Sequence, residues 1–397
     1  MEWKEVDICQ LCDSVSETYK GNASEVVLIN TSDVLDGKCL NHEYVPNKKL
    51  KGQFKKTFRK GDILYSEIRP ANKRFCFVDF EPKDYIASTK LMVLRAHEDV
   101  DPQYLYQILR SNDTLAQLQM LAESRSGTFP QITYSELSNI MVSLPSQKAQ
   151  KNIVSILSSL DRKIELNNKI NADLEEMAQA IFKNWFVDFE PFKDGKFVDS
   201  ELGMIPEGWK VISLSEIMKY NGGSQPPASE FIDTYQEGYI RFIQIRDYDN
   251  DSHITYIPIS KRNKLCDELD IMIARYGAAL GRICWGLKGA YNVALAKVTP
   301  IKSYYREYLR CYLNTSYFYQ SINNKGARCA QSGFNQSDIN SYMIAFPIDE
   351  TVVMNFNDLC SSIMDKRLSL KYENSRLSLL RDTLLPRLMS GEIEVPE

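Results

Sequence analysis

Residues 153–160, Ile-Val-Ser-Ile-Leu-Ser-Ser-Leu, open a heptad pattern that continues as far as Ile181. The positions that recur at this spacing are Ile153, Leu160, Asn167, Leu174 and Ile181, and then, 203 residues later, Phe356, Ile363, Leu370, Leu377 and Leu384. A heptad held over four intervals predicts a long helix with a coiled-coil seam. We therefore expect two such helices, from about Gln147 to Phe186 and from about Val352 to Leu385, the second limited by Pro386.

The segments ahead of the two helices also repeat each other. The matched landmarks are Trp3-Lys4 and Trp209-Lys210, residues 62–66 and 270–274, residues 104–109 and 308–313, and residues 126–129 and 332–334. Short buried strands are predicted at 62–66 and 90–94, and one helix at 104–121. The predicted fold class is α+β, with two mixed α/β modules in a pseudo-twofold repeat, separated by two long antiparallel coiled-coil helices. The alternative is that each helix packs separately on its own module.

The predicted seam contains polar side chains. Asn171 and Asn374 occupy equivalent places beside the main stripe, and such residues lower stability while they fix register and partner. Arg367 and Arg381 make the second helix a poor apolar core, so we expect that face to stay partly open to another protein. The predicted seam residues are Ile153, Leu160, Asn167, Asn171, Leu174, Ile181, Phe356, Ile363, Leu370, Asn374, Leu377 and Leu384.

The composition is typical of a globular protein in a reducing compartment. The 397 residues are 44% hydrophobic and 25% charged. No stretch reaches the ~18 apolar residues of a membrane span, and the first residues carry no secretory signal. Only Cys9 and Cys12 form a CxxC pair, and no second pair or histidine cluster completes a zinc site. We predict a cytoplasmic protein with reduced thiols, no structural metal and no membrane partner.

Motifs for catalysis are missing from the sequence. It has no GxxxxGK[ST] phosphate loop, and Pro226-Pro227 lacks the flanks of the tetrad that a DNA amino-methyltransferase needs. Asp62, Glu81 and Lys83 loosely fit the spacing of a metal-dependent nuclease. Asp270, the counterpart of Asp62, lacks the Glu-x-Lys partner, so we interpret this spacing as chance. The chain is expected to have no catalytic residue and no cofactor of its own.

Local charge favours nucleic acid although the net charge is −4. Residues 47–60 carry seven lysines and arginines and no acidic residue, and phosphate binding needs local positive potential, not a positive total. Arginine and lysine can pair with guanine, and asparagine and glutamine with adenine. In the first module the DNA-contact candidates are Lys48, Lys49, Lys51, Lys55, Lys56, Arg59, Arg69, Lys73, Arg74, Arg125, Ser126, Gly127, Thr128 and Gln131. In the second they are Arg241, Gln244, Arg246, Arg275, Tyr276, Arg282, Asn292, Lys325, Arg328, Gln331, Ser332, Gly333, Asn335 and Gln336. The alternative for each is an ordinary surface or turn residue.

Three motifs together resemble the specificity subunit of Type I restriction-modification enzymes over nearly the whole chain. Residues 147–171 and 180–189 are similar to the central conserved region of that family. Ile205-Pro206-Glu207-Gly208-Trp209 resembles the opening of its second target recognition domain, and residues 384–393 resemble its C-terminal end. One departure is that Trp3-Lys4 lacks the Pro-Glu-Gly lead of its counterpart, so the start of the first module is truncated or variable.

The resemblance implies five segments: target recognition domain 1 at 1–145, a spacer helix at 146–187, a linker at 188–204, target recognition domain 2 at 205–347, and a spacer helix with tail at 348–397. It further implies that each domain reads one half of a split, asymmetric site in double-stranded DNA, and that the helices set the gap. Two modification subunits, which hold S-adenosylmethionine, and restriction subunits, which use ATP and magnesium, are the implied partners.

A second interpretation stays open. The chain could be a protein-interaction decoy that binds modification subunits without reading DNA. The retained basic and amide-rich loops favour the specificity role, although no residue-to-base code for such loops gives the DNA sequence or the gap length.

Overall fold

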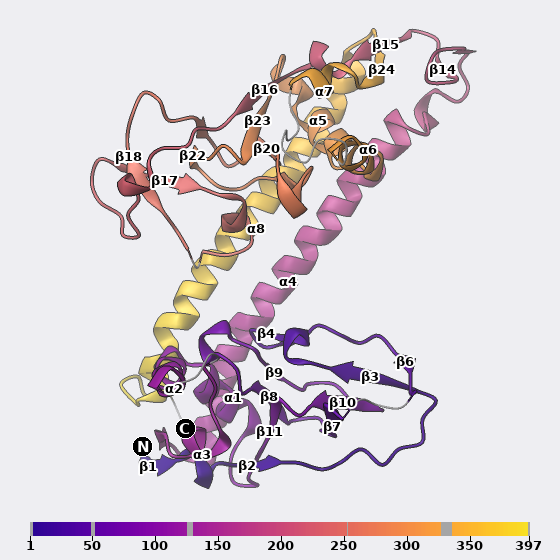
Figure 1. The fold of residues 1–397 in the computed structure, drawn as a ribbon. Helices are drawn as coiled ribbons and strands as arrows, with labels where there is room; N and C mark the ends of the chain where they lie inside the picture. The colour runs from indigo at the N-terminus through magenta and orange to yellow at the C-terminus, as the bar shows by residue number, and fades with distance from the viewer. Residues whose placement is uncertain (1–2, 49–51, 125–129, 252, 327–335, 396–397) are drawn as a thin grey trace. The chain divides into compact units, whose positions relative to one another are not determined.

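The computed structural model in Figure 1 describes residues 3–48, 52–124, 130–251, 253–326 and 336–395. The chain forms two compact units, of which the first comprises Met1–Ile164 with Arg376–Glu397 and the second Glu165–Ser375. Each unit thus combines one globular module with parts of both long helices. The five predicted domain boundaries remain predictions.

The first unit is built on two four-stranded sheets (Figure 1). One sheet has the order β2 (Cys12–Val15), β11 (Leu91–Ala96), β8 (Ile63–Ser66) and β9 (Phe75–Phe77), all antiparallel. The other has the order β6 (Val45–Pro46), β3 (Glu25–Ile29), β10 (Tyr85–Ser88) and β7 (Phe54–Lys56), in which β3 and β10 are parallel. Two short pairs complete it, β1 (Lys4–Asp7) with β12 (Met141–Leu144) and β4 (Val34–Leu35) with β5 (Lys38–Cys39). The strands predicted at 62–66 and 90–94 are confirmed as the inner strands β8 and β11, which are largely buried.

The helical segment of the first unit differs from the prediction. The single helix expected at 104–121 is wrong, because the chain forms α1 (Pro102–Arg110) and α2 (Asn112–Ser124), with α3 (Tyr134–Ser138) later. Ser111 lies between them in an extended conformation, and its hydroxyl accepts a hydrogen bond from the backbone amide of Thr114 at 3.2 Å. A serine in this position satisfies a free amide at the start of a new helix, which favours the break.

The second unit repeats the two four-stranded sheets of the first. Its first sheet has the order β16 (Met218–Gly222), β23 (Leu295–Pro300), β20 (Ile271–Ala274) and β21 (Ile283–Cys284). Its second has the order β18 (Tyr256–Pro258), β17 (Tyr239–Ile243), β22 (Gly289–Tyr291) and β19 (Leu265–Cys266), again with one parallel pair, β17 with β22. The remaining elements are β13 (Phe197–Val198), β14 (Ile205–Pro206), β15 (Trp209–Ser213) paired with β24 (Met343–Pro347), α5 (Arg306–Leu313), α6 (Ser316–Gly326) and α7 (Gln336–Asn340). The predicted α+β class and internal repeat are confirmed by this shared topology.

The two long helices pair antiparallel within each unit. Helix α4 runs from Gln147 to Phe186, as predicted, and α8 from Thr351 to Met389. In the second unit the Asn167 amide donates to Asn374 Oδ1 at 2.9 Å, and Glu175 forms an ion pair with Arg367, so positions rise along one helix as they fall along the other. Separate packing of each helix on its own module is therefore wrong for both units, because in the first unit Arg381 also pairs with Asp161 across the helices at 2.8 Å.

Pro386 does not end α8, which corrects the predicted boundary at Leu385. The helix continues for three further residues, and the backbone amide of Ser390 still donates to the Pro386 carbonyl at 2.9 Å. Leu385 and Leu388 are buried in the core of the first unit. Burial of these two side chains offsets the hydrogen bond that proline removes.

The two seam arginines find partners within their own units, and the availability of this helix face to another protein remains a prediction. Arg367 is buried against Glu175 and lies over the Trp285 ring, with its guanidinium carbon 4.6 Å from the ring centroid. Arg381 is half-buried on Asp161. Of the predicted seam residues, five are buried: Ile153, Asn167, Phe356, Ile363 and Leu370. The others are half-buried: Leu160, Asn171, Leu174, Ile181, Asn374, Leu377 and Leu384.

We predict that the end of α8 stabilises the first unit. Leu388 is only 1% exposed, so Leu388→Ala should lower the free energy of unfolding by about 2–5 kcal/mol. Leu379→Ala, on the same helix at a side chain that is 70% exposed, is the matched control. Hydrogen exchange read peptide by peptide would show faster exchange in the first unit for Leu388→Ala alone. Equal acceleration in both units, or the same effect from the control, would contradict the assignment.

Candidate nucleic-acid interface

A short turn follows the inner strand in each unit, and DNA-contact candidates lie within the first turn and on both sides of the second. Residues 69–73 follow β8, and residues 277–281 follow β20 at an offset of 208 positions. Arg69 and Lys73 have φ values of 45° and 52°, and the matching Gly277 and Gly281 have values of 69° and 84°. The two turns therefore share a left-handed backbone at both ends, with basic side chains in one and glycines in the other.

The 69–73 turn and the residues just before it contact residues 130–132. The backbone amide of Arg69 donates to the Pro130 carbonyl at 3.1 Å, and that of Ile132 donates to the Glu67 carbonyl at 2.8 Å. Residue Gln131 forms a bridge with Ile68. The structure therefore brings Arg69, Lys73 and Gln131 into one region.

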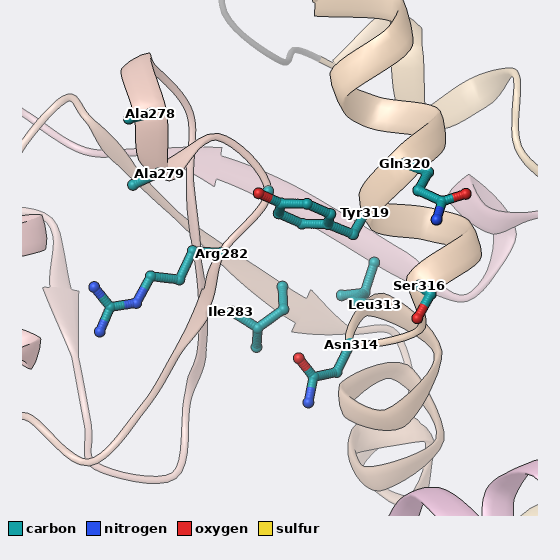
Figure 2. Close-up of a pocket in the computed structure, with 10 residues that line it drawn as sticks. Ala278, Ala279, Arg282, Ile283, Leu313, Asn314, Ser316, Tyr319 and Gln320 are labelled. Carbon is teal, nitrogen blue, oxygen red and sulfur yellow. The ribbon is translucent and has the colours of Figure 1, made fainter. Parts of the chain in front are cut away.

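The 277–281 turn faces helix α6 across a pocket. Figure 2 shows this open pocket of about 460 Å³, in which Tyr319 extends its ring from α6 toward the turn. Its lining residues are Ala278, Ala279, Gly281, Arg282, Ile283, Leu313, Asn314, Ser316, Tyr319 and Gln320. Sequence reasoning identified Arg282 but missed Tyr319 and Gln320. Their position just after the repeated 308–313 helix was the available signal.

The basic run of the first unit does not present all its side chains outward. Lys48, Lys55 and Arg59 are exposed, whereas Lys56 is half-buried and donates to the carbonyls of Thr89 at 3.3 Å and Leu91 at 2.8 Å. Burial lowers the pKa of the Lys56 ammonium, because removal from water disfavours the charged form. Lys56 is therefore a poorer candidate for phosphate contact than Lys55 in the same strand.

Arg74 and Arg282, which are 208 positions apart, both bind the protein itself. Arg74 donates to the carbonyls of Ser32 at 3.1 Å and Val34 at 3.5 Å. Arg282 donates to Asp249 at 2.7 Å, and this hydrogen bond raises the pKa of its guanidinium. The two arginines occupy equivalent positions but bind different groups, which are backbone carbonyls in the first unit and an exposed carboxylate in the second.

Acidic neighbours, which sequence reasoning did not weigh, reduce the positive potential around three second-unit candidates. Arg241 pairs with Asp251 at 2.6 Å and Arg282 with Asp249 at 2.7 Å. Arg246 lies 3.9 Å from Asp247. Negative charge this close to an arginine lowers the local attraction for phosphate.

Three further candidates, Arg275, Tyr276 and Asn292, follow β20 in the sequence, whereas the acidic residues 247–251 precede it. The Arg275 guanidinium lies over the rings of Tyr276, at 5.1 Å, and Tyr220, at 5.8 Å, and donates to the Val293 carbonyl at 3.2 Å. The Asn292 side chain accepts a hydrogen bond from the Ala294 amide at 3.1 Å. Tyr276 is exposed. This group offers an aromatic face and a positive charge, which suits a base or sugar.

Of the remaining candidates, Gln244 and Gln336 lie at the start of a helical element, and the others lie outside the residues that the structure describes. Gln244 caps a 3-10 turn, and its backbone amide donates to Asp247 at 2.8 Å. Gln336 begins α7 as an exposed residue. The candidates outside the described residues are Lys49, Lys51, Arg125, Ser126, Gly127, Thr128, Arg328, Gln331, Ser332, Gly333 and Asn335, together with the side chain of Lys325.

Asp62, the first residue of the nuclease-like spacing, forms an ion pair with Arg95. Asp62 is buried and accepts two hydrogen bonds from Arg95, both at 2.8 Å. Among the residues that the structure describes, no group of three or more His, Cys, Asp or Glu side chains could hold a metal ion. None of the described helices is long and apolar enough to span a membrane.

Two adjacent lysines of β7 provide a matched test of the interface. Lys55→Ala should weaken binding to duplex DNA about 3- to 10-fold and lower the salt slope of the binding constant by about 1, because an exposed phosphate contact is lost. Lys56→Ala should leave that slope unchanged and lower the free energy of unfolding by about 1 kcal/mol, because its two carbonyl contacts are lost. Binding titrations over a range of salt would check both. Equal salt slopes for the two variants would contradict this division.

Comparison with known proteins identifies the family. The model of the Type I restriction modification DNA specificity domain matches residues 2–176 and 206–367. The HindI specificity subunit of Haemophilus influenzae is 32% identical over 473 aligned residues, covering 99% of this chain and 100% of that protein. The MjaIX specificity subunit of Methanocaldococcus jannaschii is 27% identical, covering 90% of this chain and 85% of that protein.

A solved structure has the same fold. The Type I restriction-modification S subunit from M. genitalium superposes with a TM-score of 0.57 at 16% identity, covering 100% of this chain and 97% of that one. The family match falls once on each repeated unit, in agreement with the shared strand order. The chain therefore belongs to the Type I restriction-modification specificity subunits, the proteins of these systems that recognise DNA sequence.

Proposed function

We propose that this chain reads a bipartite, asymmetric site in double-stranded DNA, one half with each unit. The observation that carries the proposal is the pair of turns at 69–73 and 277–281. Their backbones share the same left-handed ends, but their side chains differ completely. Two copies of one scaffold with different contact residues suit two different half-sequences.

Backbone strain supports a functional role for the 69–73 turn. A residue with a side chain in the left-handed region costs roughly 1–2 kcal/mol, and glycine avoids most of this cost. Arg69 and Lys73 both occupy that region, whereas the matching positions of the second unit are glycine. Basic residues retained at strained positions favour a role in contact with phosphate or guanine.

We further propose that the chain acts in the cytoplasm as a non-catalytic subunit. It would position two modification subunits, which supply S-adenosylmethionine chemistry on adenine, and restriction subunits, which supply ATP- and magnesium-dependent translocation and cleavage. The paired helices α4 and α8 are the proposed spacer, since the Asn167–Asn374 contact suits a fixed register. The relatives' name, specificity subunit, supports this division of labour.

The proposal predicts a defined methylation pattern. Co-expression with the modification subunit of the same system should place methylated adenines in a single bipartite motif with a constant gap, read by sequencing of modified host DNA. A stable complex that adds no methylation would contradict DNA reading and favour the alternative, a decoy that only binds modification subunits.

Replacement of Arg69 by glycine should affect DNA binding and the free energy of unfolding in different ways. Arg69→Gly should weaken DNA binding about 3- to 10-fold, because the basic group is lost. The free energy of unfolding should stay constant or rise by up to about 1 kcal/mol, because glycine suits the left-handed backbone. Asp36→Gly, at another left-handed residue of the same unit, is the control without a basic group. Denaturant unfolding and binding titrations give the two readouts, and a fall in stability with unchanged binding would overturn the assignment.

A further inference from the structure

We infer that Gln119 and Asn323 are positioning residues that hold the two recognition turns for DNA reading. They lie at the same place in the repeat, 204 positions apart, on α2 and α6. This inference rests on the proposed function of the turns, and it adds one residue in each unit that does not itself contact DNA.

In the first unit Gln119 binds the turn through its side-chain oxygen. The backbone amide of Ala71, in the middle of the 69–73 turn, donates to Gln119 Oε1 at 3.0 Å. The amide nitrogen of Gln119 donates to Glu123 Oε1 at 2.6 Å. The carboxylate can only accept, so this second bond fixes the orientation of the amide and leaves its oxygen for the turn.

In the second unit Asn323 binds the turn through its side-chain nitrogen. Its Nδ2 donates to the Leu280 carbonyl in the 277–281 turn at 3.3 Å, and to the Tyr319 carbonyl of its own helix at 2.8 Å. Both partners are carbonyl oxygens, so only the nitrogen of the amide can serve them. Both units therefore hold the turn with a side-chain amide of the helix. This amide accepts a hydrogen bond from the turn in the first unit and donates one to it in the second.

In each turn the helix side chain adds a bond from a separate element to the backbone bonds of the turn. In the first unit the 3-10 turn Pro70–Asn72 lies between two left-handed residues, and in the second the 3-10 turn Gly277–Ala279 begins at a left-handed glycine. Hydrogen bonds of 3-10 geometry are weak. A helix side chain that holds the turn also holds the residues at its ends, which are Arg69 and Lys73 in one unit and the exposed Tyr276 in the other. Loss of the bond should therefore change which bases are accepted, more than it changes overall stability.

The test uses the full chain with its modification subunits and four near-isosteric variants. Gln119→Met and Asn323→Leu remove the two bonds. Gln117→Met and Asn324→Leu make the same chemical changes at exposed positions of the same two helices. We expect Gln119→Met to slow methylation at the cognate motif about 3- to 10-fold and to relax base preference in one half-sequence only. Asn323→Leu should relax the other half, and both control variants should match the unchanged chain.

A double variant that leaves the net charge unchanged tests whether the position of the turn matters, and not the presence of an amide at residue 119. Gln119→Glu combined with Glu123→Gln exchanges the two groups, so a carboxylate at 119 still accepts from Ala71 and the amide at 123 donates to it. This double variant should restore the half-sequence preference that Gln119→Met loses. Failure of the rescue, or an equal loss at both half-sequences for either single variant, would overturn the inference.

Hydrogen exchange tests the positioning without DNA. Gln119→Met should speed exchange of the Ala71 amide about 3- to 10-fold, and Gln117→Met should not. Unchanged exchange at Ala71 would overturn the inference even if methylation falls. If the unchanged chain supports no bipartite methylation while the exchange result holds, the proposed function fails and Gln119 remains a support of the turn alone.

Discussion

The structure depends on a constraint of chain topology: each long helix contributes to the core of both units. The start of α4, from Ala149 to Leu157, packs in the core of the first unit with Leu385 and Leu388 from the end of α8. The end of α4, from Ala178 to Phe186, packs in the core of the second with Val353 and Phe356 from the start of α8. Neither core is complete without a segment about two hundred residues away in the sequence. Burial of these apolar side chains is the dominant favourable contribution, so the pairing of the helices and the folding of the modules are coupled.

The contact between α4 and α8 includes buried polar and charged side chains. Asn167 is fully buried and donates to both Asn374 and Glu373, while Arg367 and Glu175 form an ion pair about two turns further along α4. Buried ion pairs seldom add net stability, because desolvation offsets their attraction. They do make other registers costly, since a shift of one turn would leave these groups without partners. Specification of register is therefore the physical consequence of this seam.

In each unit the residues that support the fold are separate from the proposed contact residues. Arg74 and Arg282 bind the protein at equivalent places, and the inner strands β8 and β20 are buried in both. The turns that follow these strands keep their backbone but change their side chains. A buried strand precedes each turn, and the side-chain amide of a helix residue binds the backbone of the turn. Such an arrangement lets side chains vary for recognition without a change in the fold.

Sequence alone determined the features that depend on local periodicity and on repetition. The heptads predicted α4 with both ends correct, and the repeat predicted two units of one topology, because spacing along a chain directly reflects which face of a helix or strand is apolar. Of the contact candidates, the sequence supplied Arg69 and Lys73 but could not rank Lys55 above Lys56. Only the tertiary structure decided that Lys56 binds backbone carbonyls, that Arg367 and Arg381 find carboxylates across the helix pair, and that Gln119 and Asn323 hold the turns. The partner of a polar side chain depends on which distant segments folding brings together, and residue type and spacing do not encode that choice.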